Sequence, residues 1–495
     1  MSRRLTLAAI LLSMFLAAME ATVVATAMPS VVADLHGLEL YGWVGAIYML
    51  SSTLTMPLYG KVADLYGRKP VLLAALVVFL VGSVASGFAH SMVALVLFRA
   101  LQGVGAGGIQ PIALTIVGDL YRPEERAKVQ GLFGAIWAVA GTSGPILGGL
   151  LVKALSWRWV FFVNVPFALL AFGLLAFAFE ENVKKKKVHF DALGSVLLSI
   201  GVVLLLSGAS RVKPLVTFPL AAIVLFAFAM VERRAVDPVL PPTLLLRRVI
   251  LVSSICGATT GALMSGTITY LPLYAQSVLG ESPTHAGLLL APLLVGWPIA
   301  STLAGRALPK HGYRPFVRSG LSITLVACIG LYAAVASHGS LLAIGAMMGL
   351  LGVGSGLSSV ATVIAVQESA AWNERGVATA STMFFRTIGG ALAVGAMGAI
   401  VASAVSAHAS PALMNDLLGP EHGKNLPKAV LETLSNDLAT GTSRAFVIVL
   451  VLGFVAVTAG LLFPKTAPKR PDDEPSDDAA ANANANANAN GKTAV

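Results

Sequence analysis

Charged residues are scarce in this chain: Asp, Glu, Lys and Arg make up 12% of its 495 residues. In soluble globular domains about a quarter of the residues are charged, so the scarcity excludes that class. Hydrophobic residues reach 56%, and the sequence therefore predicts a polytopic membrane protein. The net charge of +10 does not indicate a nucleic-acid partner, because Lys and Arg lie in short segments between apolar runs, where they orient a chain in a bilayer.

Cysteine is nearly absent as well. Cys256 and Cys328 both fall in apolar runs, which excludes a disulfide framework and a cysteine metal site. The sequence also lacks a Gly-x-x-x-x-Gly-Lys-(Ser/Thr) loop, and its loops lack Ser/His/Asp, Cys/His and metal-ligand groupings. We therefore expect neither an enzyme nor ATP hydrolysis in this chain, and no cofactor or metal.

Long apolar stretches dominate what is present. Stretches of about 18 to 29 residues, bounded by charges or turn residues, predict an all-α protein with fourteen membrane-spanning helices. The predicted spans are 5–28, 42–60, 71–89, 92–117, 128–152, 159–179, 191–209, 215–232, 249–276, 285–306, 316–337, 340–366, 376–405 and 442–463. An even number of spans leaves both termini on one side.

The distribution of cations orients these spans. Most Lys and Arg residues fall in the loops on the side of the N-terminus, for example Lys184–Lys187, and this asymmetry predicts that both termini are cytosolic. Arg3 and Arg4 before the first apolar run imitate a secretory signal. That run is long and contains Glu20, so we expect a retained first helix.

A weak internal repeat divides the chain. The segment from Gly305 to Pro315, after the tenth span, echoes the charged turn from Gly60 to Pro70, after the second. If the two turns correspond, two six-helix halves enclose a central site near the bilayer midplane, with two further helices inserted between them. The predicted domains are the N-terminal half at 1–182, the inserted pair with linkers at 183–248, the C-terminal half at 249–463 with an outside loop at 406–441, and a disordered cytosolic tail at 464–495.

The turn from Gly60 to Pro70 reads Gly-Lys-Val-Ala-Asp-Leu-Tyr-Gly-Arg-Lys-Pro. Its charges alone also fit a generic cytosolic loop. The order Gly-x-x-x-Asp-x-x-Gly-Arg-Lys, however, resembles the signature loop between the second and third helices of the major facilitator superfamily, a family of secondary transporters with two six-helix halves. The resemblance implies that Asp64 and Arg68 hold the cytosolic side shut, against the turn from Asp119 to Arg126 and the start of the thirteenth helix near Arg375. A solvated turn without a gating role remains an alternative for the segment from Asp119 to Arg126.

The first helix contains Glu20 in the sequence Met-Glu-Ala-Thr-Val-Val-Ala-Thr-Ala-Met-Pro. It resembles the first-helix signature of the drug:proton antiporter family with fourteen helices, although that family usually has Asp at the position of Glu20 and Leu at that of Met28. An acid within a spanning helix is costly and faces a polar interior or a partner. We expect Glu20 to handle protons or substrate, with a purely structural ion pair as the alternative.

Arg99 is the expected partner of Glu20. At about 1.5 Å per residue, both lie roughly 12 Å from the outer ends of their helices and so share one depth. The surrounding residues look like the fourth-helix motif of the superfamily, in which the arginine takes part in proton transfer. An arginine that only ties helices together remains the alternative.

The fifth helix contains Gly-Thr-Ser-Gly-Pro-Ile-Leu-Gly-Gly, with Gly144 and Pro145 at its centre. Small residues at three- and four-residue spacing give a smooth packing face, and the proline predicts a kink. The stretch resembles the antiporter motif Gly-x-x-x-Gly-Pro-x-x-Gly-Gly, typical of exporters. We assign Gly144 and Pro145 to gating, and the motif argues against nutrient uptake by symport.

Several polar side chains of the second half are candidates for a substrate cavity. Tyr270, Tyr274 and Gln276 fall within two turns of one helix and suit the wall of a cavity for flat, amphipathic ligands, although core packing is equally compatible with the tyrosines. Gln367 and Arg386 match the pattern of the family. Arg386 needs a partner or a water cavity inside the membrane, and the sequence leaves open whether it binds substrate or closes a gate.

The resemblance covers the chain from about Leu5 to Pro464. It implies a secondary active transporter in the plasma membrane, in bacteria the inner membrane, that exports amphipathic drugs or other small molecules in exchange for protons. The expected partners are a small-molecule substrate, protons and the lipid bilayer, and we expect a monomer. Uptake by symport and a membrane receptor or enzyme are the alternatives, and the identity and charge of the substrate stay open.

Overall fold

The structure is a computed structural model that describes residues 3–35, 41–181, 191–209, 213–235, 238–281, 285, 288–371, 374–405 and 428–465. Within these ranges every regular element is a helix. The N-terminal half comprises α1 (Arg3–Leu35), α2 (Tyr41–Tyr66), α3 (Arg68–Gly87), α4 (Met92–Leu120), α5 (Pro123–Ala154), α6 (Trp159–Phe162) and α7 (Asn164–Ala178). The inserted pair is α8 (Ala192–Ala209) and α9 (Pro214–Glu232), followed by the short α10 (Pro242–Leu245). The C-terminal half comprises α11 (Arg248–Ser277), α13 (Ala291–His311), α14 (Tyr313–Ala336), α15 (Leu341–Ser369), α16 (Arg375–Val405) and α18 (Lys428–Leu461).

Each predicted span overlaps a helix, and the span at 159–179 corresponds to α6 and α7 together. This confirms the all-α membrane fold. Among the described residues, nine helices are long and apolar enough to cross a membrane by length and composition. The count of fourteen spans stays a prediction.

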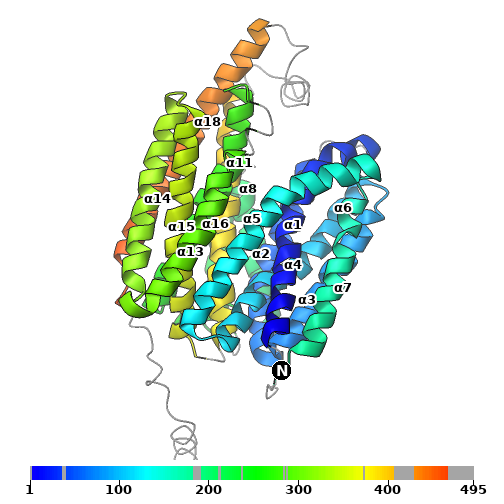
Figure 1. Cartoon of the computed structure of the whole chain (residues 1–495), viewed down its shortest axis with the longest axis vertical. Coiled ribbons are helices and arrows are strands. Elements are labelled where there is room, and N and C mark those ends of the chain that lie inside the picture. The colour runs from blue at the N-terminus through cyan, green and yellow to red at the C-terminus, as the bar shows by residue number, and fades with distance from the viewer. Residues whose placement is uncertain are drawn as a thin grey trace, which may run out of the picture.

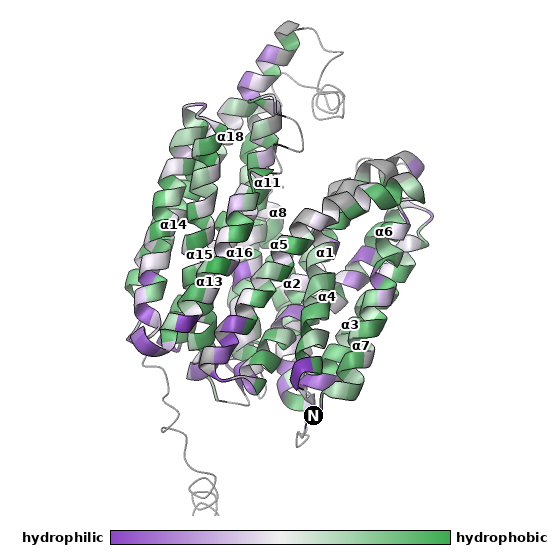
Figure 2. Cartoon of the chain, in the orientation of Figure 1, coloured by the Kyte–Doolittle hydropathy of each residue, from purple (hydrophilic) through white to green (hydrophobic). Residues whose placement is uncertain are grey.

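The two halves stand side by side and lean apart at one end (Figure 1). The N-terminal half, α1 to α7, has a core that includes Leu72, Phe79 and Ile109, whereas the C-terminal half, α11 to α18, packs around residues such as Cys328 and Phe446. Apolar residues cover most of the helices, and hydrophilic residues gather at the end where α1 begins (Figure 2). Such a distribution suits a protein whose flanks face lipid.

The halves meet at the end where α1 begins, through contacts of Asp64 with Gly376 and of Asp119 with Arg375, and we call this end the latch end. Two contacts within the halves place the chain's first and last helices there. Arg3 at the start of α1 donates to the carbonyl of Leu120 over 2.7 Å, and Arg318 near the start of α14 donates to the carbonyl of Leu461 at the end of α18. The first and last described helices therefore begin and end at the same end of the molecule (Figure 1).

The inserted pair covers one seam between the halves. Leu198 of α8 and Phe228 of α9 belong to one apolar cluster with Phe384 and Ile388 of α16, and Leu54 of α2 packs against it. Since α2 and α16 belong to different halves, α8 and α9 cover the line along which those two helices meet. At the other seam α5 contacts α13.

Two glycines support the predicted repeat. Gly67 precedes α3 with φ 102°, and Gly312 precedes α14 with φ 74°. A side chain is strained in this region of backbone space, so each turn uses glycine. The two turns are those whose sequences resemble one another, and each opens a helix at the latch end.

The structure describes only the second part of the predicted outside loop at 406–441. Residues 428–441 are helical and continue into the last span as α18. Leu434 and Leu438 are buried in the core of the C-terminal half, four residues apart on one helix face, so the polar residues between them occupy the other face. Residues 406–427, and the predicted tail from residue 466 onward, lie outside the described residues.

Candidate functional site

Glu20 and Arg99 form a buried ion pair between α1 and α4. Arg99 Nη1 donates to Glu20 Oε1, and both side chains are buried. The second carboxylate oxygen accepts a hydrogen bond of 2.6 Å from Asn164 Nδ2, at the start of α7. Each oxygen of the Glu20 carboxylate therefore has its own donor.

The Arg99 guanidinium is held from several sides. Gln102, one turn further along α4, accepts from Nη1 over 2.7 Å, and the carbonyl of Val44 on α2 accepts from Nε over 3.3 Å. The guanidinium carbon lies 4.2 Å from the centroid of the Tyr48 ring. Removing one partner of a buried ion pair costs about 3–5 kcal/mol, so this arrangement fixes α1 against α4 unless both charges change.

Sequence reasoning identified the ion pair and missed its other partners. Asn164 interrupts an apolar run and Gln102 lies three residues from Arg99, and either could have been recognised as a polar residue inside the membrane. Which side chains turn toward Glu20 depends on how α7 packs against α1. That packing is not encoded in any local pattern.

A cavity of about 400 Å³ adjoins the ion pair and lies between the two halves. It is lined by Ala17, Glu20, Val24, Met28, Gly45, Tyr48, Met49, Ser52, Met56, Arg99, Ala106, Gln110, Trp137 and Thr387. Most of these residues are apolar, and Glu20 and Arg99 supply its charges. A cavity of this size with few polar groups suits an amphipathic small molecule.

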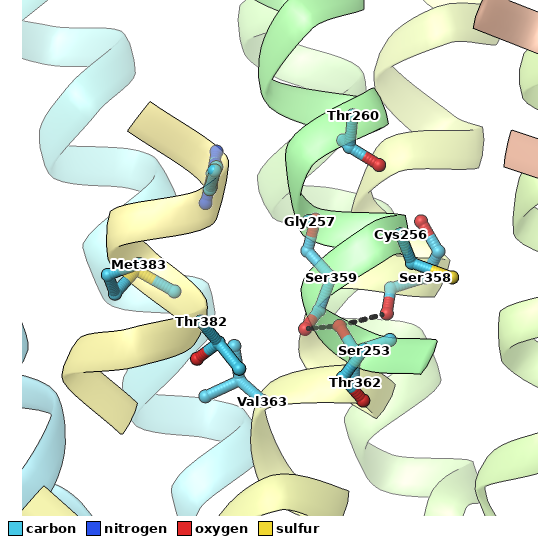
Figure 3. A pocket seen from close by; sticks show the side chains of 11 residues that line it. Ser253, Cys256, Gly257, Thr260, Ser358, Ser359, Thr362, Val363, Thr382 and Met383 are labelled. Carbon is cyan, nitrogen blue, oxygen red and sulfur yellow. Dashed lines mark hydrogen bonds between the residues drawn. The ribbon is translucent and has the colours of Figure 1, made fainter. Parts of the chain in front are cut away.

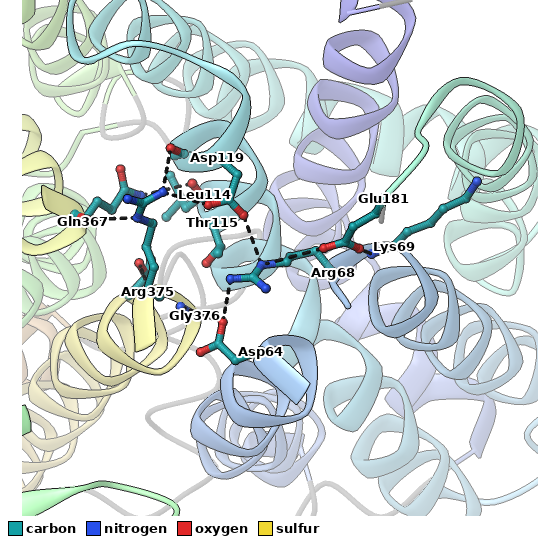
Figure 4. A network of polar contacts seen from close by, with 12 residues as sticks. Asp64, Arg68, Lys69, Leu114, Thr115, Asp119, Glu181, Gln367, Arg375 and Gly376 are labelled. Atoms are coloured by element: carbon teal, nitrogen blue, oxygen red, sulfur yellow. Dashed lines mark hydrogen bonds and ion pairs between the residues drawn. The ribbon is translucent and has the colours of Figure 1, made fainter. Parts of the chain in front are cut away.

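A second polar network lies at the latch end, away from the Glu20–Arg99 pair, and we call this network the latch. Arg68 is fully buried at the start of α3 and forms ion pairs of 2.8 Å with Asp64 and 3.1 Å with Asp119 (Figure 4). Glu181 lies 4.0 Å from Arg68 and accepts a hydrogen bond of 2.8 Å from the backbone of Lys69. These contacts join α2, α3 and α4 within the N-terminal half.

The latch then crosses to the C-terminal half. Asp64 accepts hydrogen bonds from the backbone N–H groups of Gly376 over 3.0 Å and Val377 over 2.8 Å, at the start of α16. A helix N-terminus favours such a negative charge. A Cβ on Gly376 would overlap the Asp64 carboxylate, so the close approach needs glycine. Arg375 completes the crossing with an ion pair of 2.9 Å to Asp119.

Gln367, a predicted residue of the substrate cavity, contacts residues of the latch in this structure. Its side-chain Nε2 donates to the carbonyl of Leu114 on α4 over 3.1 Å. Its backbone carbonyl accepts a hydrogen bond from Arg375 Nε over 3.0 Å. The side chain is fully buried against Gly118. Gln367 thus ties α15 to α4 across the two halves.

Arg126 does not reach the Gly60 to Pro70 turn. Its Nε donates to the carbonyl of Tyr121 over 2.6 Å, within the turn between α4 and α5. Of the antiporter motif, Gly144 is buried, whereas the side chain of Pro145 lies outside the described residues. Further along the smooth face, Gly134 packs against Pro298 of α13, so this face forms the seam between α5 and α13.

The two tyrosines of α11 have different surroundings. Tyr274 is fully buried in the core of the C-terminal half and donates to the carbonyl of Val335 over 3.2 Å. It packs in that core, where a backbone carbonyl satisfies its hydroxyl, and core packing is the alternative that the sequence left open for the tyrosines. Tyr270 is half-buried and donates to the carbonyl of Val394 on α16 over 2.9 Å. The side chain of Gln276 lies outside the described residues.

Arg386 lines two small pockets, one among α11, α15 and α16 of the C-terminal half and one between the halves. Its guanidinium lies 4.8 Å from the centroid of the Trp297 ring, and its Nη2 lies 3.8 Å from the sulfur of Met264. The ion pairs among the described residues do not include Arg386. A cation–π contact of this kind is worth about 2 kcal/mol when desolvated, less than the several kcal/mol that burial of a charge costs.

Comparison with known proteins agrees with this architecture. The profile of the Major Facilitator Superfamily matches residues 10–394. The chain is 34% identical over 408 residues to "Multidrug transporter protein MdtP" of Bacillus subtilis, covering 81% of this chain and 75% of that protein. It is 35% identical over 314 residues to "Multidrug resistance protein 3" of the same species, covering 62% of this chain and 61% of that protein.

Among solved structures, the proton:xylose symporter XylE of the major facilitator superfamily superimposes with a TM-score of 0.63 at 14% identity, covering 95% of this chain and 97% of that chain. At this identity the likeness concerns the fold alone. The sequence profile extends over both halves, and with the helical architecture described above it establishes that this chain belongs to the Major Facilitator Superfamily of membrane transporters.

Proposed function

We propose that this chain is a secondary active transporter that exports amphipathic drugs or other small molecules across the plasma membrane in exchange for protons, acts as a monomer and keeps both termini in the cytosol. The observation that carries the proposal is the position of Glu20: a buried carboxylate that lines the cavity and is paired with Arg99. The names of the two Bacillus relatives, a multidrug transporter and a multidrug resistance protein, support an exporter of drugs.

Glu20 is the proposed proton carrier. Protonation removes the charge that Arg99 neutralises, and Arg99 then keeps only neutral partners, such as Gln102 and the carbonyl of Val44. The balance between α1 and α4 changes, and the halves rock around the cavity. A proton moving down the membrane potential supplies about 2.3 kcal/mol per 100 mV, which drives the cycle.

The latch is the proposed cytosolic gate. Asp64 binds the start of α16, Arg375 binds Asp119, and Gln367 binds the carbonyl of Leu114, so three contacts join the halves at the latch end. To take up cargo from the cytosol, the halves must separate there, and these contacts must break. Arg68 keeps Asp64 and Asp119 in place for the next closure, because it pairs with both within one half.

The test is proton-driven uptake of an amphipathic dye into everted membrane vesicles, with wild type compared with Glu20→Gln. The amide keeps the shape of the side chain and cannot carry a proton, so we expect dye accumulation in the variant to lose its response to an imposed pH gradient. Asp34→Asn is the matched control, because Asp34 pairs with Arg158 inside the N-terminal half, away from the cavity lining. A variant Glu20→Gln that responds fully to the gradient would exclude Glu20 as the carrier.

Nutrient uptake by symport is the competing function. No described contact favours it over export, and the Gly-x-x-x-Gly-Pro-x-x-Gly-Gly motif around Gly144 argues against it. The vesicle assay separates the two functions by direction, since an exporter accumulates dye in everted vesicles with an acidic interior.

A further inference from the structure

We propose that Arg386 seats the anionic head of an organic carboxylate, and that the cargo of this transporter includes aromatic or aliphatic carboxylates whose apolar part lies in the central cavity. The inference rests on the proposed export function, because only a transporter has cargo. The binding site itself stands on the contacts of Arg386 and on its surroundings.

The first step concerns the charged side chains in the membrane interior and their partners. In the described part of the membrane interior Glu20 is neutralised by Arg99, and no described carboxylate forms an ion pair with Arg386. The neighbours of Arg386 are the ring of Trp297 and the sulfur of Met264, neither of which carries a charge. A partly buried cation inside the membrane region without a fixed counter-charge attracts an anion from outside the protein.

The lining of the pocket at Arg386 carries the second step. Three helices contribute, and the residues are Ser253, Cys256, Gly257 and Thr260 of α11, Ser358, Ser359, Thr362 and Val363 of α15, and Thr382, Met383 and Arg386 of α16. Figure 3 shows the hydroxyl-bearing side chains of α11 and α15 on one side of the pocket and Thr382 and Met383 of α16 on the other. The lining is rich in hydroxyl groups and contains no acid, which suits an anion.

Ser253 supplies an independent observation. Its side chain is buried, and its Oγ has no hydrogen-bond partner in the structure. Thr362 and Thr382, in contrast, donate to carbonyls of their own helices. A buried hydroxyl without a partner is costly, and an anion in this pocket, which Arg386 also lines, would accept from Ser253.

The size and the connections of the pockets select an organic carboxylate. The pocket that Ser253 lines has a volume of about 20 Å³, enough for a small polar group. Arg386 also lines a neighbouring pocket of about 60 Å³ with the aromatic side chains of Trp137 and Trp297. Trp137 and Gln110 are shared by this pocket and the central cavity of about 400 Å³. A polar head at Arg386 therefore continues into space for an apolar body.

The two ends of the site have different chemistry. The head is recognised by the guanidinium of Arg386 and the hydroxyl of Ser253, whereas the body meets side chains such as Phe133 and Trp137. An inorganic anion would fill only the head position, and a neutral aromatic molecule only the body position. A carboxylate with an aromatic ring uses both.

The experiment measures the melting temperature of the purified full-length protein in detergent against the concentration of sodium benzoate, benzyl alcohol or sodium chloride, at ionic strength held constant with sodium sulfate. For wild type we expect saturable stabilisation by benzoate at concentrations where benzyl alcohol and chloride have little effect. Arg386→Gln should weaken the apparent affinity for benzoate by about tenfold to a hundredfold, the range expected for hydrogen bonds to a charged group.

Ser253→Ala is the second variant, chosen because it folds even if Arg386→Gln does not. Removing a buried hydroxyl that lacks a partner should raise the melting temperature without ligand, while the affinity for benzoate falls by about threefold to tenfold. Ser355→Ala is the matched control. Ser355, on α15, is like Ser253 a buried serine whose hydroxyl lacks a partner, but it does not line the pocket. It should leave the affinity for benzoate unchanged.

Three outcomes would overturn the proposal. Benzoate affinity could be the same in Arg386→Gln, or in Ser253→Ala, as in wild type. Chloride could stabilise the protein at the same concentrations as benzoate, which would indicate an inorganic anion instead of cargo. Benzoate binding is measured at equilibrium without a proton gradient, so it can be interpreted even if proton-coupled export fails. Conversely, the absence of a benzoate site would not affect the result of the dye-export assay.

Discussion

Two arginines of the membrane interior, Arg99 and Arg386, differ in what surrounds them. Arg99 has a carboxylate, an amide oxygen, a backbone carbonyl and an aromatic ring around its guanidinium, all supplied by the N-terminal half. Arg386, in the C-terminal half, has an aromatic ring and a sulfur. Arg99 has a counter-charge within the protein, whereas among the described residues Arg386 forms no ion pair. The contrast supports the proposed roles, the proton at the first arginine and an anionic head at the second.

The largest effect is expected from Arg99→Gln. The change leaves Glu20 buried with only Asn164 as a donor, and breaking a buried ion pair costs about 3–5 kcal/mol. We expect a marked fall in the melting temperature of the purified protein. The double variant Glu20→Gln/Arg99→Gln should recover most of the loss, because no charge is left without a partner. A double variant as unstable as Arg99→Gln would contradict the pairing.

Asp64→Asn tests whether the latch has a different role from the Glu20–Arg99 pair. It removes the charge that accepts from Gly376 and Val377, and such charge-assisted bonds are worth about 1.5–3 kcal/mol each. We expect transport to fall by about tenfold or more while ligand binding persists, since the latch lies away from the cavity lining.

The measurement pairs dye export from vesicles with dye binding to the purified protein, and Asp34→Asn serves as the control that removes an acid without touching the contacts between the halves. Equal losses of binding and transport in Asp64→Asn would count against a gating role.

Asn164→Ala sharpens the description of the Glu20 site. It leaves one carboxylate oxygen without its donor at 2.6 Å and Ser83 without its neighbour at 3.0 Å. An unsatisfied buried group costs about 1–3 kcal/mol, so the melting temperature should fall by less than in Arg99→Gln. Proton-driven dye export should fall as well, because the carboxylate that lines the cavity loses a donor that positions it. Export equal to that of wild type would show that Asn164 only packs α7 against α1.

The sequence predicted those parts of the two sites that depend on local sequence features. The spans, the pairing of Glu20 with Arg99, and the association of Asp64, Arg68 and Asp119 depend on apolar length, depth along a helix and motif order, all of which are local. The resemblance also implied a contact with the start of the thirteenth helix near Arg375, but the sequence alone does not show which backbone N–H groups, those of Gly376 and Val377, bind Asp64.

The direction of a side chain is what the sequence leaves open. Tyr274 and Gln367 are polar residues in apolar helices, and sequence alone cannot distinguish a side chain that faces a cavity from one that reaches a carbonyl of a neighbouring helix. The sequence likewise does not show where α18 begins, because Leu434 and Leu438 form a narrow apolar stripe in an otherwise polar segment. The direction of each side chain depends on how the helices cross.

The smallest effect is expected from Arg386→Gln without ligand. The variant loses the stacking on Trp297, worth about 0.5–2 kcal/mol, and is relieved of a buried charge, so the two terms oppose one another. We expect the melting temperature without ligand to change far less than in Arg99→Gln. Arg386→Lys is the control that keeps the charge and loses the planar stacking, and it should be the less stable of the two variants at this position. If Arg386→Gln were as destabilising as Arg99→Gln, Arg386 would have a counter-charge within the protein, and the contrast between the two halves would fail.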